Sequence, residues 1–106
     1  MAKYLVRVSY TLDGVRGVLK EGGSARREAA TKAIEGVGGS VDAFYFAFGA
    51  DDVIVIADMP NQAAAASLGL TVTGAGGART SMTPLITPEE VDEAITLHPD
   101  YRAPGA

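Results

Sequence analysis

Three arginines and one tyrosine in the N-terminal third of the chain have side chains that could bind a small organic molecule. Arg7 interrupts an apolar run, where a buried cation must be paired or reach water, so it could form an interface ion pair or bind a carboxylate or enolate. Tyr10 ends the same run, and its hydroxyl could contact a ligand oxygen or complete the core. Arg26 and Arg27 follow Ser24 near an expected helix start, where they could hold an anion or be solvated. We predict Arg7, Tyr10, Arg26 and Arg27 as a ligand-binding set.

Other kinds of chemistry find little support in the sequence. The chain has no cysteine and one histidine, His98, which excludes disulfides and thiolate nucleophiles and argues against an ordinary zinc site. Asp51 and Asp52 are adjacent, but neighbouring strand residues diverge, so we expect these carboxylates to stabilise a turn rather than to bind a metal. We predict no metal and no cofactor, and the sequence leaves open whether the protein is an enzyme.

Composition indicates a single globular domain. The 106 residues are enough for one domain but not for two, and 47% of them are hydrophobic. The formal charge is −4, and the one basic cluster, Arg26-Arg27, has Glu28 beside it, which argues against a nucleic-acid partner. The N-terminus lacks the features of a signal peptide, and no apolar run approaches the roughly 18 residues of a membrane span. We therefore expect a cytoplasmic protein with no membrane partner.

The N-terminal half of the chain shows a strand, a divided helix and a hairpin. Residues 3–10 are rich in β-branched and aromatic types and indicate a strand. Thr11 is a good helix N-cap, Gly22-Gly23 interrupts the helix that follows, and Ser24 could cap its continuation. Residues 40–59 then form two strand-like runs around a Gly/Asp turn.

The C-terminal half completes the pattern with a helix, a strand and a final helix. An Ala-rich helix follows Asn61, residues 78–86 indicate a weaker edge strand that contains a proline, and Thr87 opens a helix with a capping box. The order predicts an α+β, ferredoxin-like βαββαβ fold with a four-stranded antiparallel sheet and a C-terminal helix. We expect one domain over residues 1–98 and a flexible tail over residues 99–106.

The hairpin predicts self-association because it is apolar at both odd and even positions. Alternate strand residues point to opposite faces, so both faces of the sheet need a cover. The helices of a ferredoxin-like domain cover one face, and the other would leave on the order of 10 kcal/mol of apolar burial unrealised. We predict that a second copy covers it, in a homodimer or a higher oligomer. Two alternate sets could form this open face: Leu5, Phe44, Phe46, Phe48, Ile54 and Ile56, or Val6, Val8, Tyr45, Val53 and Val55.

Several short segments spread along nearly the whole chain, from residue 3 to residue 93, form a recognisable pattern. They are Tyr4-Leu-Val, Tyr10-Thr11, Leu19-Lys-Glu-Gly-Gly-Ser-Ala-Arg-Arg-Glu28, Gly38-Gly39, Phe44-Tyr-Phe, Asp52-Val-Ile-Val, Asp58-Met-Pro, Arg79-Thr and Thr83-Pro-Leu. Together they resemble the GYD domain family, most specifically over residues 21–28 and 44–60. The Gly…Tyr-Asp motif of the family falls on Gly49, Asp51 and Asp52, so this chain keeps the Gly and the Asp and has Asp51 where the Tyr would be.

The resemblance implies a ferredoxin-like domain related to the dimeric α/β-barrels, which agrees with a sheet that needs two covers. It implies no mechanism, because relatives with the wider fold include cofactor-independent monooxygenases, small-molecule isomerases, haem-handling proteins and ligand-sensing regulatory domains, and the fold does not choose among them.

Two functions fit the sequence. The first is a homodimer with a site for a small organic molecule between the sheet and the helices, with the predicted arginines and Tyr10 as polar contacts. The alternative is a non-catalytic assembly or regulatory module whose barrel is a dimer core. The missing acid–base residues favour the alternative, and the similarity in the segment of Arg26 and Arg27 favours the first.

Overall fold

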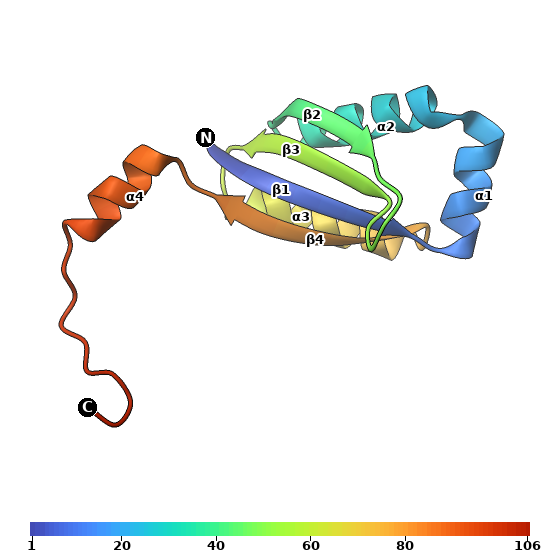
Figure 1. The fold of residues 1–106 in the computed structure, drawn as a ribbon. Helices are drawn as coiled ribbons and strands as arrows, with labels where there is room; N and C mark the ends of the chain where they lie inside the picture. The colour runs from blue at the N-terminus through green and yellow to red at the C-terminus, as the bar shows by residue number, and fades with distance from the viewer.

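The computed structural model describes residues 1–106 and contains four strands and four helices (Figure 1). The predicted α+β, ferredoxin-like fold with a C-terminal helix is confirmed, and the first helical segment is divided at Gly22 and Gly23 as expected. None of the helices is long and apolar enough to cross a membrane. In chain order the elements are β1 (Ala2–Tyr10), α1 (Leu12–Glu21), α2 (Gly23–Gly36), β2 (Ser40–Phe46), β3 (Val53–Met59), α3 (Gln62–Gly74), β4 (Ala78–Leu85) and α4 (Pro88–Ile95).

The four strands form one antiparallel sheet in the order β2-β3-β1-β4. The central strands are β1 and β3, as the predicted ferredoxin-like order requires. As predicted, β4 is an edge strand, in which Pro84 needs no ladder partner on its outer side. Helices α2 and α3 lie on one face of the sheet, α2 packing mainly on β2 and α3 mainly on β4 (Figure 1). The opposite face carries no helix, and we call it the open face.

The register of β2 corrects the predicted alternate sets. Phe44 pairs with Val55 and Tyr45 pairs with Ile54, because the pairing shifts between Val41 and Ala43. Directly paired residues share a face, so Phe44 lies with the valines on the helix face and Tyr45 lies on the open face with Ile54. The sequence prediction grouped Phe44 and Tyr45 with residues of the opposite face, because one irregularity reverses the alternation of a strand relative to its neighbour. Phe46, which pairs with Val53, was misgrouped in the same way.

The core lies between the sheet and the helices. It comprises alternate residues of the central strands together with one residue of α2 and two of α3. The buried side chains are Tyr4, Val6, Ile34, Val53, Val55, Ala57, Met59, Ala65 and Leu68. Because the other alternate residues of the same strands are also apolar, Leu5, Ile54 and Ile56 are left half-buried on the open face.

Local capping explains where the helices begin. The Thr11 and Asn61 side chains accept from the backbone N–H of Gly14 (3.2 Å) and Ala64 (2.8 Å), and Thr87 forms a complete capping box with Glu90. The expectation that Ser24 caps α2 is wrong: Gly22 is the cap residue, with φ 89°, and it offers no side-chain hydrogen bond. A glycine fits this reversal because a positive φ carries no steric cost there.

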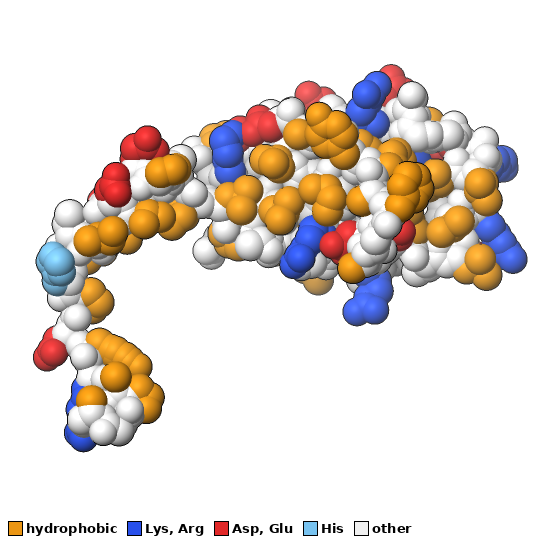
Figure 2. Space-filling model, viewed as in Figure 1, with side chains coloured by type: hydrophobic (Ala, Val, Ile, Leu, Met, Phe, Trp, Pro, Cys, Tyr) orange, Lys and Arg blue, Asp and Glu red, His pale blue; other side chains and the backbone are white.

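Helix α4 projects away from the rest of the fold (Figure 1). The molecule measures 56 × 32 × 23 Å and has a radius of gyration of 16.8 Å, whereas a compact domain of this length has about 13 Å. The difference reflects the projecting helix. Two apolar surfaces of the molecule, the open face and the exposed side of α4, therefore lack a cover (Figure 2).

Candidate functional site

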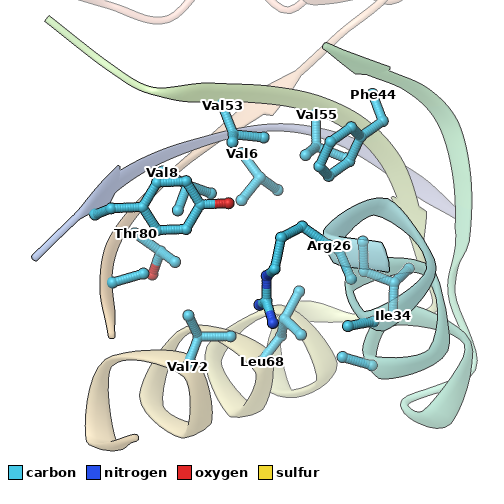
Figure 3. A pocket seen from close by; sticks show the side chains of 15 residues that line it. Val6, Val8, Arg26, Ile34, Phe44, Val53, Val55, Leu68, Val72 and Thr80 are labelled. Atoms are coloured by element: carbon cyan, nitrogen blue, oxygen red, sulfur yellow. The ribbon is translucent and has the colours of Figure 1, made fainter. Parts of the chain in front are cut away.

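An apolar pocket of about 120 Å³ lies between the sheet and the helices α2 and α3 (Figure 3). Thirteen of its fifteen lining residues are hydrophobic. The sheet contributes valines of β1 and β3 together with Phe44, and α3 contributes Leu68 and Val72. A concave, largely apolar cavity with few polar groups is the usual form of a small-molecule site.

The pocket exists because α2 presents small side chains to this space. Ala29, Ala30 and Ala33 line it, and they leave room that larger residues would fill. The Ala-rich helix α3 behaves differently, since Ala64 and Ala65 are buried and allow that helix to lie close to the sheet. Sequence reasoning missed the α2 alanines; their spacing on one side of a helix was the available indication, but such a stripe is usually a packing surface.

Arg26 is the only charged residue that lines the pocket. Its side chain extends from α2 into the space between the sheet and α3 (Figure 3). The guanidinium Nη1 lies 3.5 Å from Glu21 Oε2 at the end of α1, and 37% of the arginine side chain is exposed. An arginine held at the margin of an apolar cavity can bind an anionic group of a ligand while the rest of that ligand occupies the apolar volume.

Tyr10 lines the same pocket, and Asp52 fixes the strand end that carries it. The backbone N–H of Tyr10 donates to Asp52 Oδ2 at 2.7 Å, and the N–H of Asp52 donates to the Val8 carbonyl at 2.8 Å. Asp52 was expected to stabilise its own turn; instead its carboxylate joins the turn to β1. Gly49 and Asp51, the other two motif positions, lie in the same β2–β3 connection.

A shallower hollow adjoins the pocket beside α1. Tyr10 and Arg26 line both, and Asp13, Gly14 and Gly77 line the hollow alone. The start of α1 is held there by Thr11, whose N–H donates to the Gly77 carbonyl at 3.0 Å. This arrangement places two of the four predicted ligand-binding residues, Tyr10 and Arg26, at the boundary between the apolar pocket and the surface.

The other two predicted residues, Arg7 and Arg27, lie elsewhere. Arg7 is opposite Ile54 and Ser81 on the open face, and its Nε is buried without a hydrogen-bond partner. Arg27 is exposed on α2 and borders a surface hollow beside Phe46. The fold thus brings Tyr10 and Arg26 together and separates them from Arg7, because successive strand residues with odd and even numbers face opposite sides of the sheet.

One ion cluster stabilises the end of the sheet. The Lys3 ammonium pairs with Asp42 and with Asp58 at 3.1 Å, and these hydrogen bonds, first that to Asp42, raise the pKa of Lys3 above its ordinary value of 10.5. Asp58 therefore has a structural partner in the Lys3 side chain. No group of three or more His, Cys, Asp or Glu side chains could hold a metal ion.

The chain is thus a ferredoxin-like α+β domain with an apolar cavity between its sheet and its helices. The family model of the GYD domain matches residues 4–95, so the chain belongs to the GYD domain family, as the sequence resemblance indicated. The match extends to the last residue of α4 and thus includes the projecting helix. Comparisons with curated proteins and with solved structures give no match.

Proposed function

We propose that this GYD domain binds a small organic anion with an apolar body in the pocket between the sheet and the helices. The observation that carries the proposal is the single charged residue, Arg26, in a lining that is otherwise nearly all apolar. Tyr10 supplies a second polar group at the same boundary. Together they suit a carboxylate or an enolate oxygen, and Tyr10 is the only titratable residue of the lining other than Arg26.

The size of the pocket limits the apolar body. An engineered apolar cavity of about 150 Å³ accepts benzene, and the pocket here has about 120 Å³. One six-membered ring, or an aliphatic chain of similar volume, is therefore the expected scale of the buried part, with the charged group directed toward Arg26.

Benzoate is a suitable probe because it combines one ring with one carboxylate. We expect benzoate to shift NMR signals of pocket residues and to bind more tightly than neutral benzyl alcohol. Arg26→Met should remove this preference, with a loss of affinity of about tenfold for one charge-assisted contact. Arg27→Met is the matched control, since it removes the same charge one residue along the same helix but outside the pocket. Equal losses in both variants, or shifts confined to other surfaces, would contradict the proposal.

We also propose that the open face forms the interface of a homodimer. Leu5, Ile54, Ile56 and the exposed Tyr45 supply its apolar area. The half-buried Arg7, whose Nε has no hydrogen-bond partner in its own chain, gives the face a cation that a second copy could pair. Arg7→Leu should alter the dimer dissociation constant measured by sedimentation while leaving benzoate binding unchanged. Loss of benzoate binding with an unchanged dimer would instead place Arg7 in the ligand site.

The uncovered open face also favours the alternative of a non-catalytic assembly module. The two functions differ in what fills the pocket. Ala30→Phe adds a ring to the pocket wall; in a ligand-binding protein it should abolish benzoate binding and leave the dimer intact. If no anion binds in the pocket, and if Ala30→Phe changes only the stability of the protein, the protein is an assembly module.

A further inference from the structure

We propose that the C-terminal arm, defined as residues 86–101, clasps a second copy of this chain by lying on that copy's open face along its edge strand β4, beside the area where the two sheets meet. The inference rests on the proposed homodimer and adds a second contact to it. Its starting point is that α4 projects from the domain with its apolar side chains in solvent (Figures 1 and 2).

The arm carries an apolar stripe that has no partner within its own chain. Val91 and Ile95 are four residues apart and therefore lie on one side of α4. The exposed fraction is 42% for Val91 and 62% for Ile95. Ile86, Leu97 and Tyr101 extend the apolar surface on either side of the helix and are still more exposed than Val91. Isolated helices shorter than about 12–15 residues are marginal in water, and α4 has 8 residues, so this helix requires packing to be stable.

The charges of the arm and of the open face are complementary. Helix α4 contains acidic residues and no basic one. Helical geometry places Glu90 and Asp92 beside the apolar stripe. On the open face, Arg79 lies opposite Ser9, on the same side of the sheet as Arg7, and Arg7 has a buried Nε without a partner. Lys3, the third cation of this face, is already paired within its own chain.

The direction in which the arm leaves the domain favours a second copy over the arm's own sheet. Only Ile86 and Thr87 separate β4 from α4, a span of at most about 7 Å. Thr87 is held in the capping box, and the arm leaves the domain at the end of the sheet (Figure 1). In Figure 2 apolar side chains continue from the sheet along the arm on the side shown. In a two-fold dimer through the open faces, each arm can therefore reach the partner. The two arm contacts are then identical and related by the two-fold axis.

Sedimentation of the full chain tests the contribution of the stripe. Ile95→Asp should raise the dimer dissociation constant at least tenfold, because it places a carboxylate in an apolar contact. The matched control is Leu70→Asp, which changes an equally prominent exposed leucine of α3 on the helix side of the sheet and should leave the constant unchanged. An unchanged constant in Ile95→Asp would overturn the arm contact alone, whereas a monomeric natural chain would overturn the homodimer as well.

Cross-linking locates the contact. The natural chain has no cysteine, so Ile95→Cys can be labelled uniquely with a benzophenone maleimide and mixed with isotope-labelled protein. We expect cross-links between chains, on peptides of β1 and β4. Glu93→Cys, on the opposite side of α4, is the control and should give few. Cross-links within one chain, or equal yields from both positions, would overturn the proposal.

Discussion

Single residues determine the positions of the side chains that line the pocket. Asp52 illustrates this, because its carboxylate accepts from the Tyr10 backbone 42 positions away and so ties the β2–β3 turn to the strand end beside the pocket. The adjacent Asp51 makes no such bond. A motif position that sequence reasoning assigned to turn stability therefore also positions a residue of the candidate site.

The two aspartates give a matched test. Asp52→Ala should lower the free energy of unfolding by about 1.5–3 kcal/mol, the usual contribution of a hydrogen bond to a charged group, and should weaken benzoate binding by displacing Tyr10. Asp51→Ala should change stability by no more than about 0.5 kcal/mol. Urea denaturation of both variants, followed by benzoate titration, measures the difference. Equal effects would mean that the Asp52–Tyr10 bond contributes nothing.

The Lys3 cluster makes a prediction about pH. Since the folded-state pKa of Lys3 is raised above 10.5 by its two aspartates, its stabilising effect is fully present below 10.5 and is lost as the pH rises through the folded-state value. Lys3→Met should therefore lower the melting temperature at neutral pH, and the difference from the natural chain should shrink at pH values well above 10.5. A difference that persists there would mean that the aliphatic stem, and not the charge, stabilises the sheet end.

At the scale of elements, the approach of α1 to the α3–β4 connection shapes the hollow beside the pocket. A Cβ on Gly14 would lie 1.9 Å from the Gly77 carbonyl oxygen, which is backbone and cannot move aside easily. A Cβ on Gly17, in the same helix, would meet nothing within 4 Å.

Substitution by alanine at these two glycines should change the stability of the protein in opposite directions. Gly14→Ala should destabilise the protein by about 1–3 kcal/mol because of the backbone clash. Gly17→Ala should stabilise it by up to about 1 kcal/mol, since alanine is the better helix former. Thermal denaturation distinguishes the two, and destabilisation of similar size in both would show that α1 as a whole, rather than the close approach at Gly14, is sensitive.

At the scale of the whole molecule, the pocket and the open face lie on opposite sides of one sheet. Ligand binding and self-association therefore use different residues and should be separable by mutation. Native mass spectrometry of gently purified protein tests both together: we expect a dimer mass, and a reproducible additional mass if the pocket retains a ligand. A clean dimer would favour the assembly module, and a monomer would contradict the role proposed for the open face.

The sequence by itself determined the order of elements, the central strands and the helix starts at Thr11, Asn61 and Thr87, because hydrophobic periodicity and capping are local properties. It also indicated that one sheet face would remain uncovered.

Only the tertiary structure decided which residues share a face and a pocket. The irregularity between Val41 and Ala43 reverses which residues of β2 face the helices and which face the open side. No local sequence pattern indicates this irregularity. The same is true of the separation of Arg7 from Arg26: the two guanidinium groups fall on opposite sides of the sheet because the helices occupy only one face. Which residues lie together in space depends on how segments that are distant in the chain pair with one another. This pairing is set by the packing of the whole domain.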